Sequence, residues 1–421
     1  MKRVLIATLA ALACCWAIWE AAHTGIARTL AERAESTGEI NPADRAVRLT
    51  PNDAEAHFAR GEVLQSNEDY AGASIEFERA VQLRPRDYFL WLMLGVTRDE
   101  NQDQEGALRA LRQALALAPS YAPPRWQLGN LLLRMGQDDE AFAEMRSAAI
   151  GNPNLWPNVI DLAWGVYGGD VDSVVKVIRP ESAEARLSLA LFLARHNQPA
   201  GALEQFRLTS SSDNPKNESL LAALLEAKAF SEAYEVWARI HRLPLRTLPD
   251  GRVSDTGIRD GGFEEPITVG QPGFGWQITL SVANVTMSVD TNEHHSGSRS
   301  LRIDFRGNSS PTSPLLTQLV LAKPQTHYRL SFAAQSREFV SASLPIITVT
   351  DASDPKNTVL AQSPPLSSDQ NGWQELTLDL TTGSQTQAIT ISLSRQSCAQ
   401  DPCPAFGVLW LDSFGLREAV Q

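Results

Sequence analysis

The sequence predicts a multidomain protein in which an all-α first half is followed by an all-β sandwich, with an apolar helix before both. Three observations predict this architecture. Four columns of residues recur with a period of 34 between about residues 50 and 155, apolar residues alternate with polar ones beyond residue 262, and an apolar run follows Lys2 and Arg3. At 421 residues the chain is also too long for one hydrophobic core.

The composition narrows the class of protein. Hydrophobic residues make up 43% and charged residues 20% of the chain, which excludes a mostly disordered chain and a polytopic membrane protein. The 37 Lys and Arg residues are outnumbered by 49 Asp and Glu residues, and the formal net charge is −12. Because proteins that bind nucleic acids concentrate positive charge, we expect no DNA or RNA partner.

Residues 1–27 are predicted to form a signal anchor or transmembrane segment. The apolar run from Val4 to Trp19 has 16 residues, between the length of a signal-peptide core and the roughly 20 residues of a membrane span. The basic flank favours a cytoplasmic N-terminus. We therefore expect a single pass through a bacterial inner membrane, with the bulk of the chain in the periplasm. The stretch ending at Cys14 faintly resembles a lipoprotein box, so cleavage, lipidation and retention all stay open.

Small residues and prolines stand at fixed intervals in the first half. The columns are Gly61, Gly95 and Gly129; Ala73, Ala107 and Ala141; Ala80, Ala114 and Ala148; and Pro85, Pro119 and Pro153. Together with Trp91, Leu94 and Leu111, this pattern resembles the tetratricopeptide repeat (TPR) family. Gly or Ala is expected where two antiparallel helices approach most closely, and proline is expected to end the second helix. Weaker copies before and after extend the predicted TPR solenoid to about residues 28–243.

The resemblance implies a concave surface, lined by the first helix of each repeat, that binds a peptide or helix of a protein partner. When the groove positions of the TPR family are matched to this sequence, Phe58, Leu92 and Trp126 fall at one recurring position. Asn130 and Arg134 lie nearby. Only the last two suit a carboxylate-binding groove, so a clamp for acidic tails is not expected. The three apolar residues either pack between helices or form a stripe for a partner helix.

Residues 244–257 are predicted to be a linker, because Pro and Gly recur there among polar residues. Alternation then takes over in residues 258–421, as where Leu301, Ile303 and Phe305 alternate with polar residues. Period-two alternation is typical of half-buried strands. We expect eight or nine antiparallel strands in a sandwich.

The order of landmarks in this half adds a second resemblance. Asp260-Gly261-Gly262-Phe263-Glu264 opens the segment, Gly275-Trp276 follows, and Trp410-Leu411-Asp412 comes near its end. The segment resembles the galactose-binding-like jelly rolls of the carbohydrate-binding modules found beside xylanases and glucanases. Many relatives hold a structural calcium ion, and the resemblance implies Glu264 and Asp412 as its ligands, with backbone carbonyls near Asp260 and Ser298. The alternative is that both acids are solvated. No other cofactor is expected, and none is required.

Sugar binding needs exposed aromatic faces, and the tryptophans here are Trp276, Trp373 and Trp410. No spare aromatic platform is evident, so a structural or protein-binding sandwich is favoured over one that binds glycans. Cys398 and Cys403 flank a short loop and are expected to form a disulfide outside the cytoplasm.

The sequence offers no catalytic motif. None of the seven histidines forms a helical metal pair or accompanies a nucleophile signature, and no phosphate loop or dinucleotide fingerprint occurs. We therefore expect no enzyme. The leading hypothesis is a membrane-anchored periplasmic adaptor, which binds a protein partner through its solenoid and acts in envelope polysaccharide assembly or export. The alternative is a carbohydrate-binding protein that uses its C-terminal sandwich.

Overall fold

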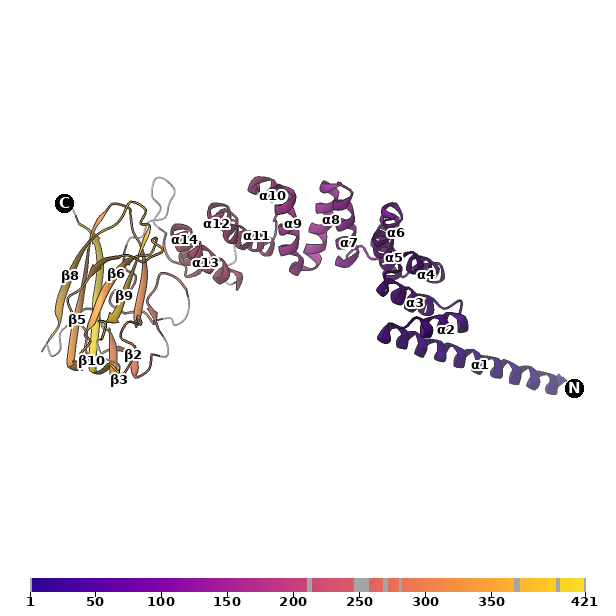
Figure 1. Cartoon of the computed structure of the whole chain (residues 1–421), viewed down its shortest axis with the longest axis horizontal. Helices are drawn as coiled ribbons and strands as arrows, with labels where there is room; N and C mark the ends of the chain where they lie inside the picture. The colour runs from indigo at the N-terminus through magenta and orange to yellow at the C-terminus, as the bar shows by residue number, and fades with distance from the viewer. Residues whose placement is uncertain are drawn as a thin grey trace. The chain divides into compact units, whose positions relative to one another are not determined.

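The computed structural model describes residues 2–209, 214–245, 257–267, 272–279, 282–366, 372–398 and 402–419. Most of the predicted linker and most of the loop enclosed by Cys398 and Cys403 lie outside these residues. The chain divides into two compact units, Met1–Pro180 and Glu181–Gln421. The first unit is helical, and the described residues of the second form four more helices and a β-sandwich (Figure 1).

Helices account for both the first unit and the start of the second. In the first unit they are α1 (Lys2–Thr37), α2 (Ile40–Leu49), α3 (Ala54–Ser66), α4 (Tyr70–Leu83), α5 (Tyr88–Glu100), α6 (Gln104–Leu117), α7 (Ala122–Arg134), α8 (Asp138–Gly151), the 3-10 turn η1 (Pro153–Leu155), α9 (Trp156–Val166) and α10 (Val171–Ile178). In the second unit they are α11 (Ala183–Arg195), α12 (Pro199–Arg207), α13 (Lys216–Glu226) and α14 (Phe230–Ile240). The predicted helical half is confirmed.

Local sequence signals explain where the repeat helices begin. Asp53, Asp69, Asp87 and Asp103 each precede a helix, and each carboxylate accepts a hydrogen bond from a backbone N–H of the first turn. Such caps satisfy donors that have no partner inside the helix, and replacing one by Ala costs about 1 kcal/mol.

The glycine column marks the closest approach within each helix pair, as the period of 34 predicted. A Cβ added to each of these glycines would lie under 3 Å from a large side chain of the paired helix. The contacts are Gly61 with Phe77 (2.7 Å), Gly95 with Leu111 (2.6 Å) and Gly129 with Met145 (2.7 Å). Because each large side chain occupies the volume of the missing Cβ, α3/α4, α5/α6 and α7/α8 form closely packed pairs.

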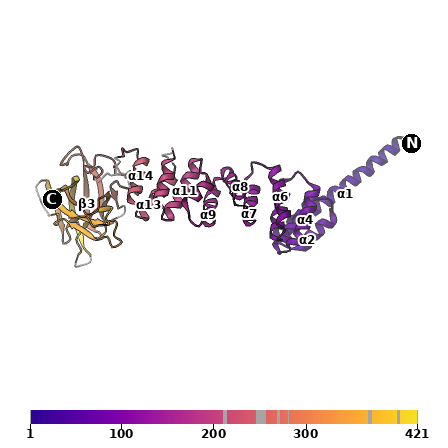
Figure 2. The same ribbon diagram turned by 90° about the horizontal axis from the view of Figure 1, so that it is seen from above.

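Helix α1 serves two roles in one unbroken segment of 36 residues. Its C-terminal part is the first helix of the solenoid, since Ala27, Ala31 and Ala34 are buried against α2 and α3. Its N-terminal part extends away from the other helices in both views (Figures 1 and 2). The segment Ala7–Thr37 is long and apolar enough to cross a membrane, a test that a signal sequence also passes. The helix does not break at the border that the sequence predicted after residue 27.

The sandwich consists of two antiparallel sheets, as predicted, with ten strands among the described residues rather than eight or nine. One sheet has the order β1-β4-β9-β6-β7 and the other β2-β3-β10-β5-β8. The strands are β1 (Gln277–Ile278), β2 (Val285–Asp290), β3 (Ser300–Asn308), β4 (Leu316–Leu321), β5 (His327–Ser341), β6 (Pro345–Asp351), β7 (Val359–Gln362), β8 (Gln374–Thr381), β9 (Ala388–Arg395) and β10 (Pro404–Glu418).

The predicted alternation gives the sandwich its core. Leu301, Ile303 and Phe305 of β3 are at most 3% exposed and belong to one large apolar cluster, while Arg302 and Asp304 between them point to the opposite face and form an ion pair. Side chains of both sheets fill this cluster, so the sheets pack face to face.

Candidate functional site

Phe58, Leu92 and Trp126 occupy equivalent positions of α3, α5 and α7, one in each clear repeat. Leu92 is buried in an apolar cluster of the solenoid. The half-buried ring of Phe58 lies 5.7 Å from the rings of both Phe77 and Phe89. These two side chains therefore pack between helices, which is one of the two roles that the sequence allowed. Trp126 keeps part of its indole exposed.

The two polar groove residues differ in their surroundings. Asn130 is half-buried on α7. Arg134, at the end of the same helix, is exposed and forms an ion pair with Asp99 of α5. Because Asp99 neutralises this guanidinium, Arg134 is not poised to receive a free carboxylate. This ion pair also connects α5 and α7, the first helices of two adjacent repeats.

The first helices of the solenoid also form a cavity of about 440 Å³, which is lined by Glu35 of α1 together with Glu62 and Gln65 of α3. Burial raises the pKa of both glutamates, and neighbouring acids, Glu55 among them, raise it further. In the described part of the chain neither carboxylate has an ion-pair partner. We call the surface formed by Glu35, Glu62, Asp99 and Arg134 on α1, α3, α5 and α7 the groove face.

The sequence did not predict Glu35 as a groove residue, because the repeat that contains it was recognised only as a weaker copy. The sequence also did not predict a group of aromatic side chains, Tyr88, Phe89 and Tyr121, which we call the aromatic edge. Tyr88 and Phe89 start α5, and the Tyr88 ring lies 5.3 Å from that of Tyr121, which precedes α7. Phe89 is 42% and Tyr121 52% exposed, so aromatic surface is exposed at the N-terminal ends of α5 and α7, whereas Asp99 and Arg134 lie at their C-terminal ends.

In the sandwich, the carboxylates of the two acids expected to bind calcium, Glu264 and Asp412, both lie near Gly262. A Cβ added there would be 3.7 Å from Asp412 Oδ1 and 3.9 Å from Glu264 Oε1, so the missing Cβ leaves a space bordered by one oxygen of each carboxylate. Asp412 is fully buried, and among the described residues neither acid has an ion-pair partner. Carboxylate oxygens are ligands that a hard cation such as calcium prefers, and these two would supply part of its usual shell of about six to eight oxygens.

Backbone donors hold both carboxylates in place. Asp412 Oδ2 accepts hydrogen bonds from the N–H groups of His295 (2.7 Å) and Ser296 (2.9 Å). The side chain and the N–H of Ser298 donate to Glu264 at 2.6 and 2.7 Å and lower the pKa of its carboxyl. The Asp260 carbonyl already accepts two hydrogen bonds, from Phe263 N and Trp276 Nε1, and so is not free for a cation. Within the described residues no group of three or more His, Cys, Asp or Glu side chains is placed to hold a metal ion.

Two of the three sandwich tryptophans offer no platform for a sugar. Trp276 is 5% exposed in the core. Trp410 is 2% exposed, because the guanidinium groups of Arg302 and Arg337 lie 5.4 and 5.1 Å from the centre of its ring. Its Nε1 donates to Asp290 at 2.9 Å. The outward-facing indole is therefore covered by cation–π contacts.

Trp373 is different, because it is half-buried just before β8. Its ring centre lies 5.7 Å from that of His295, whose Nε2 is 3.4 Å from the exposed carboxylate of Glu375. A partly exposed indole beside polar hydrogen-bonding groups is the combination that sugar recognition uses.

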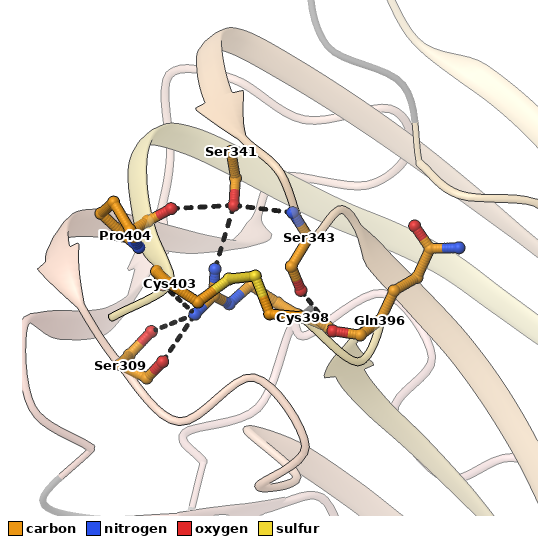
Figure 3. The surroundings of a disulfide bond; sticks show 8 residues. Ser309, Ser341, Ser343, Gln396, Cys398, Cys403 and Pro404 are labelled. Atoms are coloured by element: carbon orange, nitrogen blue, oxygen red, sulfur yellow. Dashed lines mark hydrogen bonds between the residues drawn. A yellow bond between two sulfur atoms is a disulfide. The ribbon is translucent and has the colours of Figure 1, made fainter. Parts of the chain in front are cut away.

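Cys398 and Cys403 form the predicted disulfide, which closes the connection from β9 to β10 (Figure 3). Arg395, the last residue of β9, is 2% exposed and donates to the carbonyls of Ser309 (2.6 Å) and Cys403 (3.0 Å) and to Ser341 Oγ (3.1 Å). These contacts join the ends of four strands from both sheets. The disulfide fixes one of the carbonyls that this buried guanidinium needs.

Comparisons with known proteins match the two halves separately. A family model described as the tetratricopeptide repeat matches residues 41–88. The helical half contains tetratricopeptide repeats. Among solved structures, MamA (residues 41 to the end) from Desulfovibrio magneticus RS-1 is 19% identical and covers 44% of this chain and 92% of its own, with a TM-score of 0.31. YrrB, described as a TPR protein with an unusual peptide-binding site, is 22% identical over 39% of this chain and 88% of its own, with a TM-score of 0.31.

The C-terminal half also has similar solved structures. The CBM22-1 xylan-binding domain of Xyn10C from Paenibacillus barcinonensis is 18% identical and covers 38% of this chain and 93% of its own, with a TM-score of 0.27. A search among curated proteins finds no match.

Proposed function

We propose that the protein is a non-catalytic, membrane-anchored periplasmic adaptor that binds a protein partner through its TPR solenoid. The observation that carries this proposal is the groove face, where the exposed Glu35 and the half-buried Glu62 have no ion-pair partner among the described residues, while exposed aromatic rings lie at the N-terminal ends of α5 and α7. A peptide or helix with a basic residue and apolar side chains would neutralise the acids and cover the aromatic rings.

Helix α1 and the disulfide support the proposed membrane anchor and the proposed compartment. From Leu9 to Ile26 the large apolar side chains of α1 are more than half exposed in the protein, so a lipid environment would remove them from water. Lys2 and Arg3 favour a cytoplasmic N-terminus, which leaves the solenoid and sandwich outside the cytoplasm. The Cys398–Cys403 disulfide suits an oxidising compartment.

The process that we propose is the assembly or export of an envelope polysaccharide. An anchored solenoid that recruits a protein, joined to a sandwich that resembles carbohydrate-binding modules in its sequence landmarks, suits such a role. We also propose that Glu264 and Asp412 hold a structural calcium ion that ties the opening turn of the sandwich to its last strand.

Crosslinking of the full-length protein in its native membranes, followed by isolation of its adducts, tests the adaptor role. We expect a protein partner whose yield falls about tenfold with Glu62→Lys, equivalent to about 1.4 kcal/mol of binding free energy. The control is Glu105→Lys on α6, which reverses an exposed charge that pairs within its own helix, with Arg109. Equal yields from the two variants would contradict binding at the groove face.

The second candidate function is carbohydrate binding by the sandwich, and the half-buried Trp373 beside His295 and Glu375 is the observation that favours it. Titration of the full-length protein with xylan, β-glucan and bacterial exopolysaccharide tests it. If this function is right, Trp373→Ala abolishes the response, whereas Phe406→Ala, which removes a 51% exposed ring from β10, retains it. The absence of any response in the unmodified protein would exclude this candidate.

A further inference from the structure

Helix α1 connects the apolar segment directly to the core of the solenoid. It runs from Lys2 to Thr37 without proline, and its last three turns are held by the burial of Ala27, Ala31 and Ala34. Glycine occurs inside it only at Gly25, where the backbone remains helical. The segment before Ala27 is therefore a continuation of a packed helix and not a tether.

The length of α1 sets how far the solenoid is from the bilayer. A hydrocarbon core of about 30 Å needs about 20 helical residues at about 1.5 Å each, so a span that starts at Val4 ends near His23. Trp16 and Trp19 then lie toward the outer interface, where tryptophan is enriched. Only Thr24, Gly25 and Ile26 separate this point from Ala27, the first buried residue of the solenoid.

The side chains that we propose to bind the partner lie on α1 and on the helices that follow it in the first unit. Glu35 lies on α1 itself, about 18 Å along the helix from His23. The cavity that it lines is completed by Glu62 and Gln65 of α3, and the exposed rings of the aromatic edge belong to the start of α5 and the residue before α7. No flexible segment of the chain lies between the bilayer and this cavity.

We propose that the partner of the groove face is an integral membrane protein, which presents a segment within about 20 Å of the outer membrane surface. This inference rests on the proposed anchor and goes beyond it. A groove held at a fixed distance from the bilayer suits a partner in the same membrane, whereas a soluble periplasmic protein could bind at any distance. The absence of a spacer confines the groove face to the layer in which membrane-embedded partners expose their loops.

Site-specific photocrosslinking in membranes tests the inference. A photoreactive phenylalanine analogue replaces Gln65 in the cavity of the full-length protein, and the control carries it at Ile150, which is 72% exposed at the end of α8. We expect an adduct at position 65 that resists extraction by alkaline carbonate, and none at position 150. An adduct with lipid or with an extractable protein, or no adduct at position 65, overturns the inference.

A flexible insertion tests whether the crosslink depends on the distance between the groove face and the bilayer. A flexible Gly/Ser insertion of about 20 residues between Thr24 and Gly25 spans about 25 Å on average and releases the solenoid from the bilayer. We expect the adduct at position 65 to fall at least about fivefold, whereas the same insertion between Asp250 and Gly251 leaves it unchanged. An undiminished adduct overturns the inference. If carbonate extracts the unmodified protein itself, the anchor fails instead, and with it the proposed function.

Discussion

A Cβ added to Gly273 would lie 2.4 Å from both Cδ1 and Nε1 of the Trp237 indole, so the loop that opens the sandwich presses its backbone onto the last helix of the solenoid. The next residue, Phe274, continues this contact, with its ring 5.0 Å from that of Tyr234 and 5.7 Å from that of Trp237. Helix α14 and the sandwich therefore share a small aromatic core, and the second unit includes both.

This relationship predicts that Gly273→Ala loosens α14 from the sandwich. The added Cβ has no room beside Trp237, and φ at this residue is 150°, which favours glycine. We expect a loss of about 1–3 kcal/mol in the unfolding free energy and separate melting of helices and sandwich in calorimetry of the full-length protein in detergent. Gly275→Ala is the control, because its Cβ would make an ordinary contact of 3.8 Å with the same indole. Equal melting curves for the two variants would argue against a shared core.

The glycine column of the repeats leads to a second prediction. Gly95→Ala places a Cβ 2.6 Å from Leu111 Cγ and should cost about 1–3 kcal/mol in unfolding free energy by overpacking α5 against α6. Gly165→Ala in α9 meets nothing within 4 Å and should be neutral or stabilise the helix by up to about 1 kcal/mol. Chemical denaturation followed by circular dichroism measures both. The idea fails if Gly95→Ala is as stable as Gly165→Ala.

A buried ion pair inside the solenoid makes its stability depend on pH. His57 Nδ1 donates to Glu76 Oε2 at 2.7 Å, and His57 Nε2 lies 3.0 Å from the Pro51 carbonyl oxygen, so only the doubly protonated ring satisfies both acceptors. Burial alone lowers the pKa of His57, but these two hydrogen bonds together with the negative charge of Glu76 outweigh it and raise the pKa. Burial would raise the pKa of Glu76, but His57 and Arg60 lower it.

The signs of these two shifts fix the pH window. The raised pKa of His57 stabilises the fold below about pH 6.5, where the unfolded residue is protonated, and this stabilisation disappears as the pH rises through the folded value. The lowered pKa of Glu76 stabilises the fold above about pH 4.3 and loses its effect as the pH falls through its own folded value. We expect His57→Gln to cost about 2 kcal/mol near pH 5.5 and less above the folded pKa of His57. Denaturation measured from pH 5 to 9 would refute this if the cost were independent of pH.

The sequence predicted the parts of the structure that repeat or alternate, because periodicity reports local packing. The period of 34 placed Gly95 against its paired helix, and alternation placed Ile303 in the sandwich core. It did not predict contacts between residues of different repeats or halves. The Asp99–Arg134 pair joins two adjacent repeats, and the Trp237–Gly273 contact lies across the predicted linker, so neither leaves a local pattern in the chain.

The same limit applies to the candidate sites. The disulfide was predictable because Cys398 and Cys403 are close in sequence, and the acids at Gly262 were suggested by a resemblance. Glu35 was missed because its repeat was recognised only as a weaker copy. The helix packs against α2 and α3 through the small side chains of Ala27, Ala31 and Ala34, which give a weak hydrophobic pattern. The covering of Trp410 by Arg302 and Arg337 depends on strand order, which only the fold supplies.

The last prediction concerns calcium at Glu264 and Asp412. An ion that binds only the folded sandwich raises the unfolding free energy by about 2.7 kcal/mol at a hundredfold excess over its Kd. A chelator should therefore lower the melting temperature of the sandwich in the full-length protein. Asp412→Ala should remove this sensitivity, because a space bordered by one carboxylate attracts a divalent ion much less. Asp379→Ala, which removes an exposed carboxylate paired with Arg329 on β5, should keep it. A melting temperature indifferent to both calcium and chelator would exclude the ion and leave the two carboxylates held by backbone N–H groups and the Ser298 hydroxyl.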